Sequence, residues 1–158
     1  MKLDQTDRKI LEILQSNGRI TNAQLASEIG ISPPGMLERV KRLQNTGVIH
    51  RYVALLDREK VGKGIMAIVS VSLAVHQLKS VDEFAKEIDK LDDVLECHHI
   101  TGEDDFMLKV AVDNIKDYED FILYKISQIP GVNKIRTSFV LSTMKYDTKI
   151  TINENGDK

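Results

Sequence analysis

Two arginines and a lysine lie within four positions of one another in residues 30–43, GISPPGMLERVKRL. The guanidinium groups of Arg39 and Arg42 can each form two parallel hydrogen bonds with a guanine edge or a phosphate group. Lys41 can contact phosphate without base specificity. Glu38 can accept a hydrogen bond from a cytosine amino group, or it can hold the two arginines in position. This chemistry suits a polyanion such as a nucleic acid.

The start of the same segment offers a second kind of anion contact. Ser32 suits an N-cap, and Pro33 and Pro34 fit the first helical positions, where a missing N–H is tolerated. Free backbone N–H groups at a helix start can bind phosphate together with Ser32, and Gly35 lets the backbone approach closely. The candidate nucleic-acid contacts are therefore Ser32, Gly35, Glu38, Arg39, Lys41 and Arg42.

A different chemistry is carried by residues 100–108, ITGEDDFML. Gly102 permits an unusual backbone conformation, and Glu103, Asp104 and Asp105 place three carboxylates close together. A carboxylate there can pair with an ammonium group while backbone amides receive a carboxylate, which is typical of a small-molecule site. From spacing alone, an ordinary acidic hairpin turn is the alternative.

Three helices must position the basic segment. Capping residues and apolar residues at helical spacing predict helices over residues 4–17, 21–29 and 32–46. In the third helix, the apolar residues project to one side and both arginines to the other. A short helix, a tight turn and a longer basic helix form a helix-turn-helix, whose second helix enters the major groove of DNA. A solvated basic surface is the competing interpretation.

The second half of the chain predicts a layered domain. The pattern strand–helix–strand occurs twice, over residues 65–75, 80–91, 94–101, 106–112, 118–129 and 132–141. This order predicts the fold class α+β with a ferredoxin-like βαββαβ domain, an antiparallel sheet with both helices on one face. Because the other face then lacks a cover, we expect a dimer formed sheet face to sheet face through Ile68, Val69, Val71, Leu108, Val110 and Val140.

The connection between the halves predicts a strand over residues 48–56, which are rich in β-formers, and a hinge over the charged residues 57–64. The predicted domains are 1–50 for the helix-turn-helix, 51–64 for the strand and hinge, 65–146 for the ferredoxin-like domain and 147–158 for a polar tail. We expect this tail to be frayed, or to add an edge strand.

Charge distinguishes the two halves of the chain, and composition indicates where in the cell the protein is expected. Residues 1–64 carry eleven Lys/Arg against seven Asp/Glu, whereas residues 65–158 carry eleven against seventeen. A basic first half fits a polyanionic partner. No apolar run approaches a membrane span, and the single cysteine, Cys97, cannot form an internal disulfide. We therefore expect a cytoplasmic protein with no membrane partner.

Signals for catalysis or metal binding are weak. Cys97, His98 and His99 are consecutive on a predicted strand, so their side chains alternate between faces and cannot all reach one metal ion. The sequence contains no nucleophile elbow and no glycine-rich phosphate loop. We expect no enzymatic activity, no metal and no cofactor.

Three separated stretches resemble the Lrp/AsnC family of bacterial and archaeal transcriptional regulators: LDQTDRKILEILQSNGRITNAQLASEIGISPPGMLERVKRLQNTGVI, GEDDFMLKV and PGVNKIRTSFVLSTMK. The resemblance covers residues 3 to about 145. It implies an N-terminal helix-turn-helix, a C-terminal ferredoxin-like effector domain, and homodimers that often assemble to octamers. It also implies that a small amino acid, such as leucine, asparagine or lysine, binds between dimers and changes assembly or affinity for double-stranded DNA.

The resemblance also implies an effector site in the acidic loop. The family's Gly-x-x-Asp-aromatic signature falls on Gly102, Asp105 and Phe106. The implied effector contacts are Thr101, Gly102, Asp104, Asp105, Thr137 and Ser138. One departure concerns Glu38, because that position is often basic in relatives, so the operator sequence cannot be copied from them.

Two other functions compete with an effector-controlled regulator. Siroheme decarboxylases resemble the family in both domains but are enzymes that use histidines near a tetrapyrrole, and His98 and His99 keep that interpretation open. The basic residues Arg39 and Arg42 argue against it, because an enzyme needs no DNA surface. An architectural DNA-binding protein without an effector is the third interpretation.

Overall fold

The computed structural model describes residues 2–74 and 78–152. The chain divides into two compact units. One comprises Met1–Leu55 together with the C-terminal segment that begins at Lys145, and the other comprises Leu56–Met144. Each unit has its own hydrophobic core.

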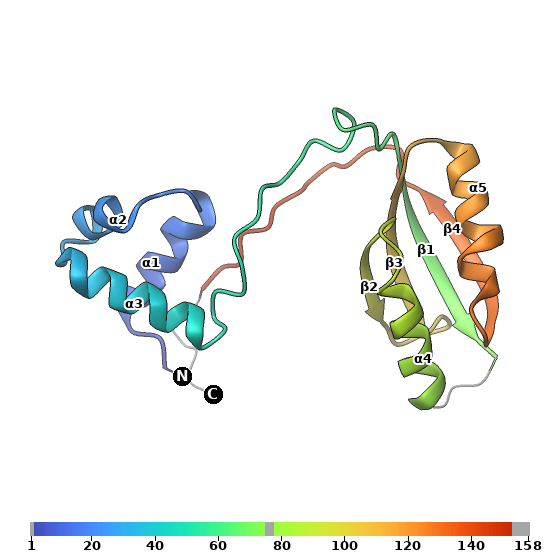
Figure 1. Ribbon diagram of the computed structural model, residues 1–158, viewed down its shortest axis with the longest axis horizontal. Coiled ribbons are helices and arrows are strands. Elements are labelled where there is room, and N and C mark those ends of the chain that lie inside the picture. Colours follow the sequence, from blue (N-terminus) through green and yellow to red (C-terminus); the bar gives the residue numbers. More distant parts are fainter. Residues whose placement is uncertain (1, 75–77, 153–158) are drawn as a thin grey trace. The chain divides into compact units, whose positions relative to one another are not determined.

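The first unit is built from three helices, α1 (Gln5–Ser16), α2 (Asn22–Ile29) and α3 (Pro33–Asn45), shown in Figure 1. Each begins at an N-cap whose side chain accepts a backbone N–H: Asp4 for α1, Thr21 for α2 and Ser32 for α3. The three predicted helices are thus confirmed. Their fully buried core residues are Ile10, Leu25, Met36 and Leu43.

The strand predicted over residues 48–56 is wrong, because no strand precedes β1 in the described part of the chain. The β-forming side chains are present, but a strand needs a hydrogen-bonded neighbour, and residues 2–74 and 78–152 provide none for this segment. Its apolar residues remain largely in solvent, among them Val53, Leu55 and Leu56.

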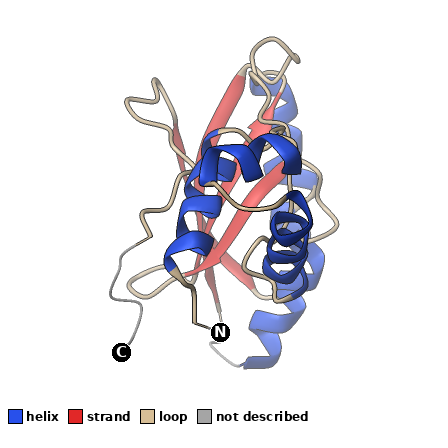
Figure 2. Cartoon of the chain, turned by 90° about the vertical axis from the view of Figure 1, so that its left-hand side faces the viewer, coloured by secondary structure: helices blue, strands red, loops and turns tan. Residues whose placement is uncertain are grey.

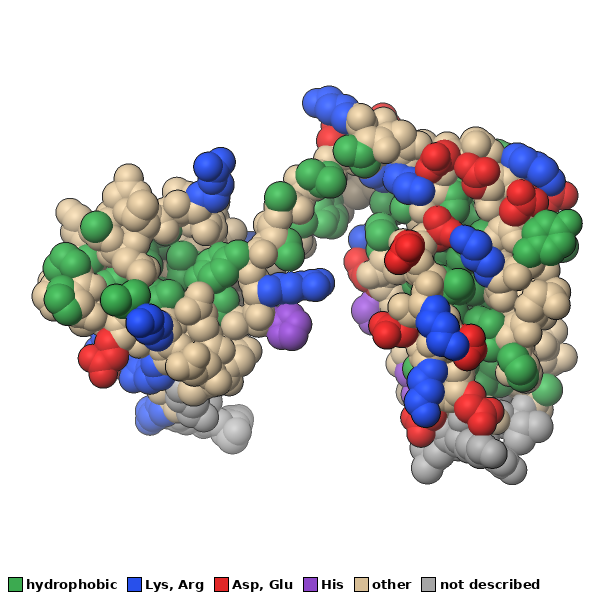
Figure 3. All heavy atoms as spheres, in the orientation of Figure 1, with side chains coloured by type: hydrophobic (Ala, Val, Ile, Leu, Met, Phe, Trp, Pro, Cys, Tyr) green, Lys and Arg blue, Asp and Glu red, His purple; other side chains and the backbone are tan. Residues whose placement is uncertain are grey.

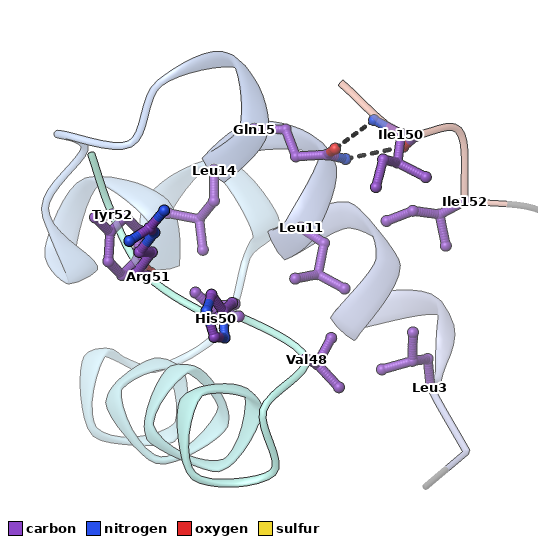
Figure 4. A pocket seen from close by; sticks show the side chains of 11 residues that line it. Leu3, Leu11, Leu14, Gln15, Val48, His50, Arg51, Tyr52, Ile150 and Ile152 are labelled. Atoms are coloured by element: carbon purple, nitrogen blue, oxygen red, sulfur yellow. Dashed lines mark hydrogen bonds between the residues drawn. The ribbon is translucent and has the colours of Figure 1, made fainter. Parts of the chain in front are cut away.

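The C-terminal segment, predicted as a frayed polar tail or an edge strand, packs on the first unit instead. The side-chain amide of Gln15 in α1 forms two hydrogen bonds with the backbone of Ile150 (Figure 4). It accepts one from the Ile150 N–H at 2.6 Å and donates one to the Ile150 carbonyl oxygen at 3.1 Å. Ile152 packs against the helical core. Ile150 and Ile152 help to line a mainly apolar groove of about 340 Å³ with Leu11 and Leu14. Residues 153–158 of the predicted tail lie outside the described residues.

The second unit contains a four-stranded antiparallel sheet in the order β2-β3-β1-β4 (Figure 1). Figure 2 shows its strands in red. Its elements are β1 (Ile65–Leu73), α4 (Leu78–Ile88), β2 (Val94–His99), β3 (Phe106–Val112), α5 (Ile115–Tyr124), a 3₁₀ turn (Ile126–Gln128) and β4 (Val132–Phe139). This order confirms the predicted ferredoxin-like plan and the α+β class. Val75, at the end of the first predicted strand, lies outside the described residues.

The apolar residues expected on the open face of the sheet lie mostly on the other face. Val69, Val71, Leu108 and Val110 are fully buried in one cluster with Phe84 of α4 and Phe121 of α5. Because side chains alternate along a strand, these four share the helix-covered face, and the premise that they need a second copy is wrong.

The open face carries mixed side chains. Ile68 is opposite Lys109, and Ser70 is opposite both Met107 and Arg136, and opposed residues share a face. On the helical side of the unit, side chains of both charge signs are interspersed over α4 and α5 (Figure 3).

Candidate nucleic-acid interface and effector loop

The start of α3 is fixed by its own sequence. Ser32 Oγ accepts the backbone N–H of Gly35 at 3.3 Å, and the two prolines occupy the first two helical positions. A Cβ atom on Gly35 would lie 3.1 Å from Ser32 Oγ, so the glycine leaves room for this cap. The hydroxyl proton of Ser32 can still be donated to an anion near the helix N-terminus.

The buried stripe of α3 consists of Met36, Val40 and Leu43, as predicted. At about 100° per residue, Arg39 lies only about 60° from Met36, whereas Lys41 and Glu38 lie roughly 140° to 160° away. Arg42 lies about 120° from Met36, so the prediction that both arginines project opposite the buried stripe is wrong, and they lie on a flank of the helix. The residues that face directly away from the core, and are exposed, are Pro34, Glu38, Lys41 and Asn45.

The flanking arginines contact two aspartates at the start of α1. Asp7 Oδ1 accepts a hydrogen bond from Arg39 Nη1 at 2.9 Å and from Arg42 Nη2 at 2.6 Å, and Asp7 Oδ2 accepts a second bond from Arg42 at 2.6 Å. Asp4 Oδ2 accepts from Arg39 Nη1 at 2.6 Å. We call Asp4, Asp7, Arg39 and Arg42 the Asp–Arg cluster.

Burial within the Asp–Arg cluster is uneven. The side chain of Asp7 is 1% exposed, whereas those of Arg39 and Arg42 are 31% and 45% exposed. The hydrogen bond from Arg39 lowers the pKa of Asp4 below its usual value, and the hydrogen bonds to Asp4 and Asp7 raise that of Arg39. Both shifts favour the charged forms of Asp4 and Arg39. The cluster pairs two carboxyl groups with two guanidinium groups.

Glu38 is one candidate for holding the arginines in position, but the ion pairs of the cluster assign that role to Asp4 and Asp7. Glu38 is exposed. The sequence indicates one role of Asp4 and Asp7, because acidic residues three positions apart at a helix start form a capping box. That pattern does not indicate that the same residues pair with arginines on α3.

Four of the predicted DNA contacts meet at one place on the surface. Gly35, Glu38, Arg39 and Arg42 line a recess of about 370 Å³ on α3. Lys41 and Ser32 are exposed on the same helix and at its N-cap. The recess offers guanidinium donors and a carboxylate acceptor, which is the set of groups that hydrogen-bonds base edges in a major groove.

In the second unit, the loop after β2 is tied to the end of β1. Asp105 Oδ2 accepts the backbone N–H of Leu73 at 2.7 Å, and the Asp105 N–H donates to Val71 at 3.0 Å. Gly102 has a φ of 128°, which only glycine adopts easily. Thr101 is exposed beside it. The glycine and Asp105 thus shape the loop, and Thr101 lies at its surface.

Asp104 is held from two strands. Its Oδ1 accepts a hydrogen bond from Ser72 Oγ of β1 at 3.0 Å, and its Oδ2 pairs with Arg136 Nη2 of β4. The pair with Arg136 lowers the pKa of Asp104, whose side chain is 7% exposed. Arg136 also lies 3.7 Å from Glu103, and half of its side chain is exposed. Neither Ser72 nor Arg136 is among the effector contacts predicted from the sequence.

The structure does not bring Thr137 and Ser138 to this loop. Thr137 Oγ1 shares a 2.5 Å hydrogen bond with the hydroxyl of Tyr118 in α5, so it faces the helices. Ser138 points to the open face and pairs with Ile68, four positions from Ser72 along β1 and therefore roughly 13 Å away. Arg136, two residues earlier on β4, is the β4 side chain that contacts the loop.

The two histidines of β2 lie on opposite faces of the sheet. The His98 ring contacts Glu96 at 3.2 Å, and the His99 ring lies 5.2 Å from Phe106 on the helix-covered face. Within residues 2–74 and 78–152, no group of three or more His, Cys, Asp or Glu residues could hold a metal ion. In that same part of the chain, none of the helices has the length and apolar character needed to span a bilayer.

Two family models match most of the chain. Residues 66–150 match the Lrp/AsnC ligand binding domain, and residues 3–50 match a winged helix-turn-helix DNA-binding model. Neither model describes an enzyme.

Relatives match this chain over almost its whole length. The transcriptional regulator AzlB of Bacillus subtilis is 34% identical, and the match covers 96% of this chain and 97% of AzlB. The leucine-responsive regulatory protein of Escherichia coli is also 34% identical, with 95% and 92% covered. Among solved structures, the transcriptional regulator NMB0573 of Neisseria meningitidis in complex with L-Met is 36% identical, with a TM-score of 0.90 and 96% and 98% covered.

Proposed function

The chain belongs to the Lrp/AsnC family of transcriptional regulators, and from this premise we propose that a small amino acid controls its binding to double-stranded DNA. The observation that carries the proposal is α3, a helix with a fixed N-terminus whose exposed side bears a recess with donors and an acceptor. The first unit binds DNA, and the second unit binds the effector and assembles the protein in the cytoplasm.

On DNA, the residues of α3 have different tasks. Glu38 lies on the outermost side of α3 and contacts base edges, while Lys41 contacts phosphate. Arg39 and Arg42 contact bases or phosphates from the flank. Ser32 and the helix N-terminus bind a phosphate, and Gly35 allows close approach.

The proposed effector is an α-amino acid, because its carboxylate and its ammonium group complement two charged side chains at the loop, Arg136 and Glu103. The exposed part of the Arg136 guanidinium receives the effector carboxylate, and Glu103 pairs with its ammonium group. Asp104 holds Arg136, while Thr101 and the Gly102 backbone line the site. The complex of the Neisseria relative with L-Met supports this ligand class.

We further propose a homodimer that assembles to an octamer. Large apolar side chains stay exposed along the segments that connect the units (Figure 3), notably Leu56, Leu141 and Met144, and Leu141 is 98% exposed. Exposed apolar residues in such number favour coverage by a second copy of the chain. Light scattering on the purified chain tests this, because a monomer at micromolar concentration would contradict it.

The decisive experiment selects genomic DNA fragments bound by the full chain, with and without a mixture of the twenty amino acids. We expect a restricted set of fragments, an affinity that falls steeply with salt, and a change of affinity or assembly when the mixture is present. A chain that retains no fragment at low salt is not a DNA-binding regulator. The chain is an architectural DNA-binding protein if the mixture changes neither its bound fragments, nor its affinity, nor its assembly, and if no amino acid raises its melting temperature.

A further inference from the structure

We propose that Asp7 is a positioning residue that sets the DNA specificity of α3. Its carboxylate fixes the side chains of Arg39 and Arg42 before DNA arrives. This inference rests on the proposed DNA-binding function and names a residue on α1 that has no contact with DNA in that proposal.

Each oxygen of the Asp7 carboxylate accepts two hydrogen bonds from groups within the protein. Oδ1 accepts hydrogen bonds from both arginines, and Oδ2 accepts one from Arg42 and one from the Asp4 backbone N–H at 3.2 Å. With a side chain that is 1% exposed, Asp7 cannot meet DNA directly. Its effect on DNA must pass through the two arginines.

Fixing these arginines has two physical consequences. A free arginine side chain has rotamer entropy that must be lost on ordered binding, and the Asp7 carboxylate has already removed part of it. In addition, Asp4 and Asp7 neutralise the two arginines, which weakens their attraction to phosphate on any sequence. Both effects favour one matched site over random DNA.

Without the Asp7 carboxylate, the side chains of Arg39 and Arg42 are more mobile and their positive charges are less neutralised. Each can then find phosphates around it, so binding to unrelated DNA strengthens while the ordered contacts at the selected site weaken. A residue that only stabilises the helical unit predicts another result, namely a lower melting temperature with unchanged discrimination among DNA sequences.

The test compares Asp7→Asn with Glu12→Gln in the full chain. Both variants remove one negative charge from α1, but Glu12 is exposed and lies outside the Asp–Arg cluster. The DNA probes are one fragment recovered by genomic selection and a scrambled duplex of equal length and composition. The measurements are the two dissociation constants over a salt series and the melting temperature of each variant.

For Asp7→Asn, we expect the ratio of the two affinities to fall by about fivefold or more, which corresponds to losing one ordered base contact. We also expect the salt slope on the scrambled duplex to steepen by about 0.9, or one phosphate contact. Glu12→Gln should change the ratio by less than about twofold. Equal ratios for the two variants would overturn the inference.

Asp4→Asn provides the second measurement in case Asp7→Asn does not fold. Asp4 is half exposed, contacts Arg39 alone of the two arginines, and keeps its N-cap role as asparagine. We expect a smaller fall of the ratio in the same direction, and no fall would refute the inference. If the wild-type chain binds no fragment, the proposed function fails and this inference fails with it, whereas binding with unaltered ratios rejects the inference alone.

Discussion

Truncating the chain after Asp147 should destabilise the DNA-binding unit although it removes no residue of the three helices. The truncation deletes the partly buried Ile152 side chain, worth about 1 kcal/mol, since full burial of such a side chain is worth about 1.5 to 3. It also removes the two hydrogen bonds between Gln15 and Ile150, worth about 0.5 kcal/mol each because they are exposed. The total is about 2 kcal/mol.

For a unit of this size, that loss lowers the melting temperature by about 10 °C. Thermal unfolding of the full and truncated chains, followed by far-UV circular dichroism, resolves the transition of the helical unit. The control ends after Ile152 and keeps every contact described above. If truncation after Asp147 left the transition where the control has it, the C-terminal segment would not be part of the first unit, and the packing seen in Figure 4 would contribute nothing.

Three further outcomes follow from single side chains. Lys41→Ala should weaken binding to specific and unrelated duplexes equally and reduce the salt slope by about 0.9, as measured by fluorescence anisotropy over a salt series, because Lys41 is exposed and contacts phosphate in the proposal. Asp104→Asn should make the free energy of unfolding depend less on pH in acid. Arg136 holds the pKa of Asp104 below its usual 3.8, so the ionised carboxylate stabilises the fold above that pH, and this contribution is lost as the pH falls below it. Urea unfolding of the variant and the wild type between about pH 5 and 2 measures the difference. Met36→Ala should cost about 2 to 5 kcal/mol and abolish DNA binding at elevated temperature, because Met36 is fully buried in the helical core; chemical denaturation measures the cost.

Local chemistry made the helix starts predictable. The capping box of Thr21 and Gln24 and the cap formed by Ser32 use groups within three residues of each other. Such contacts form wherever the local sequence allows them, so they need no knowledge of the fold. The apolar run of residues 106–112 likewise predicts a strand, and β3 has these bounds, Phe106–Val112.

The candidate sites were predictable only in part. The recess on α3 contains four of the six residues expected to contact DNA, whereas the effector loop gains Arg136 and Ser72 and lies apart from Thr137 and Ser138. A motif identifies the loop, but the strand pairing decides which residue of β4 reaches it. A shift of two positions along a strand changes that neighbour, and spacing in the sequence does not fix the register.

The sequence by itself determined the three helices, the ferredoxin-like order of the second unit and the two segments that carry chemistry, because periodicity, caps and turns act between near neighbours. Only the tertiary structure decided that Asp7 holds Arg39 and Arg42, that Asp104 pairs with Arg136, and that Ile150 returns to Gln15. These partners are 32, 35, 32 and 135 residues apart. Ion pairs and hydrogen bonds act over a few ångströms, so such partners meet only after the whole chain has folded.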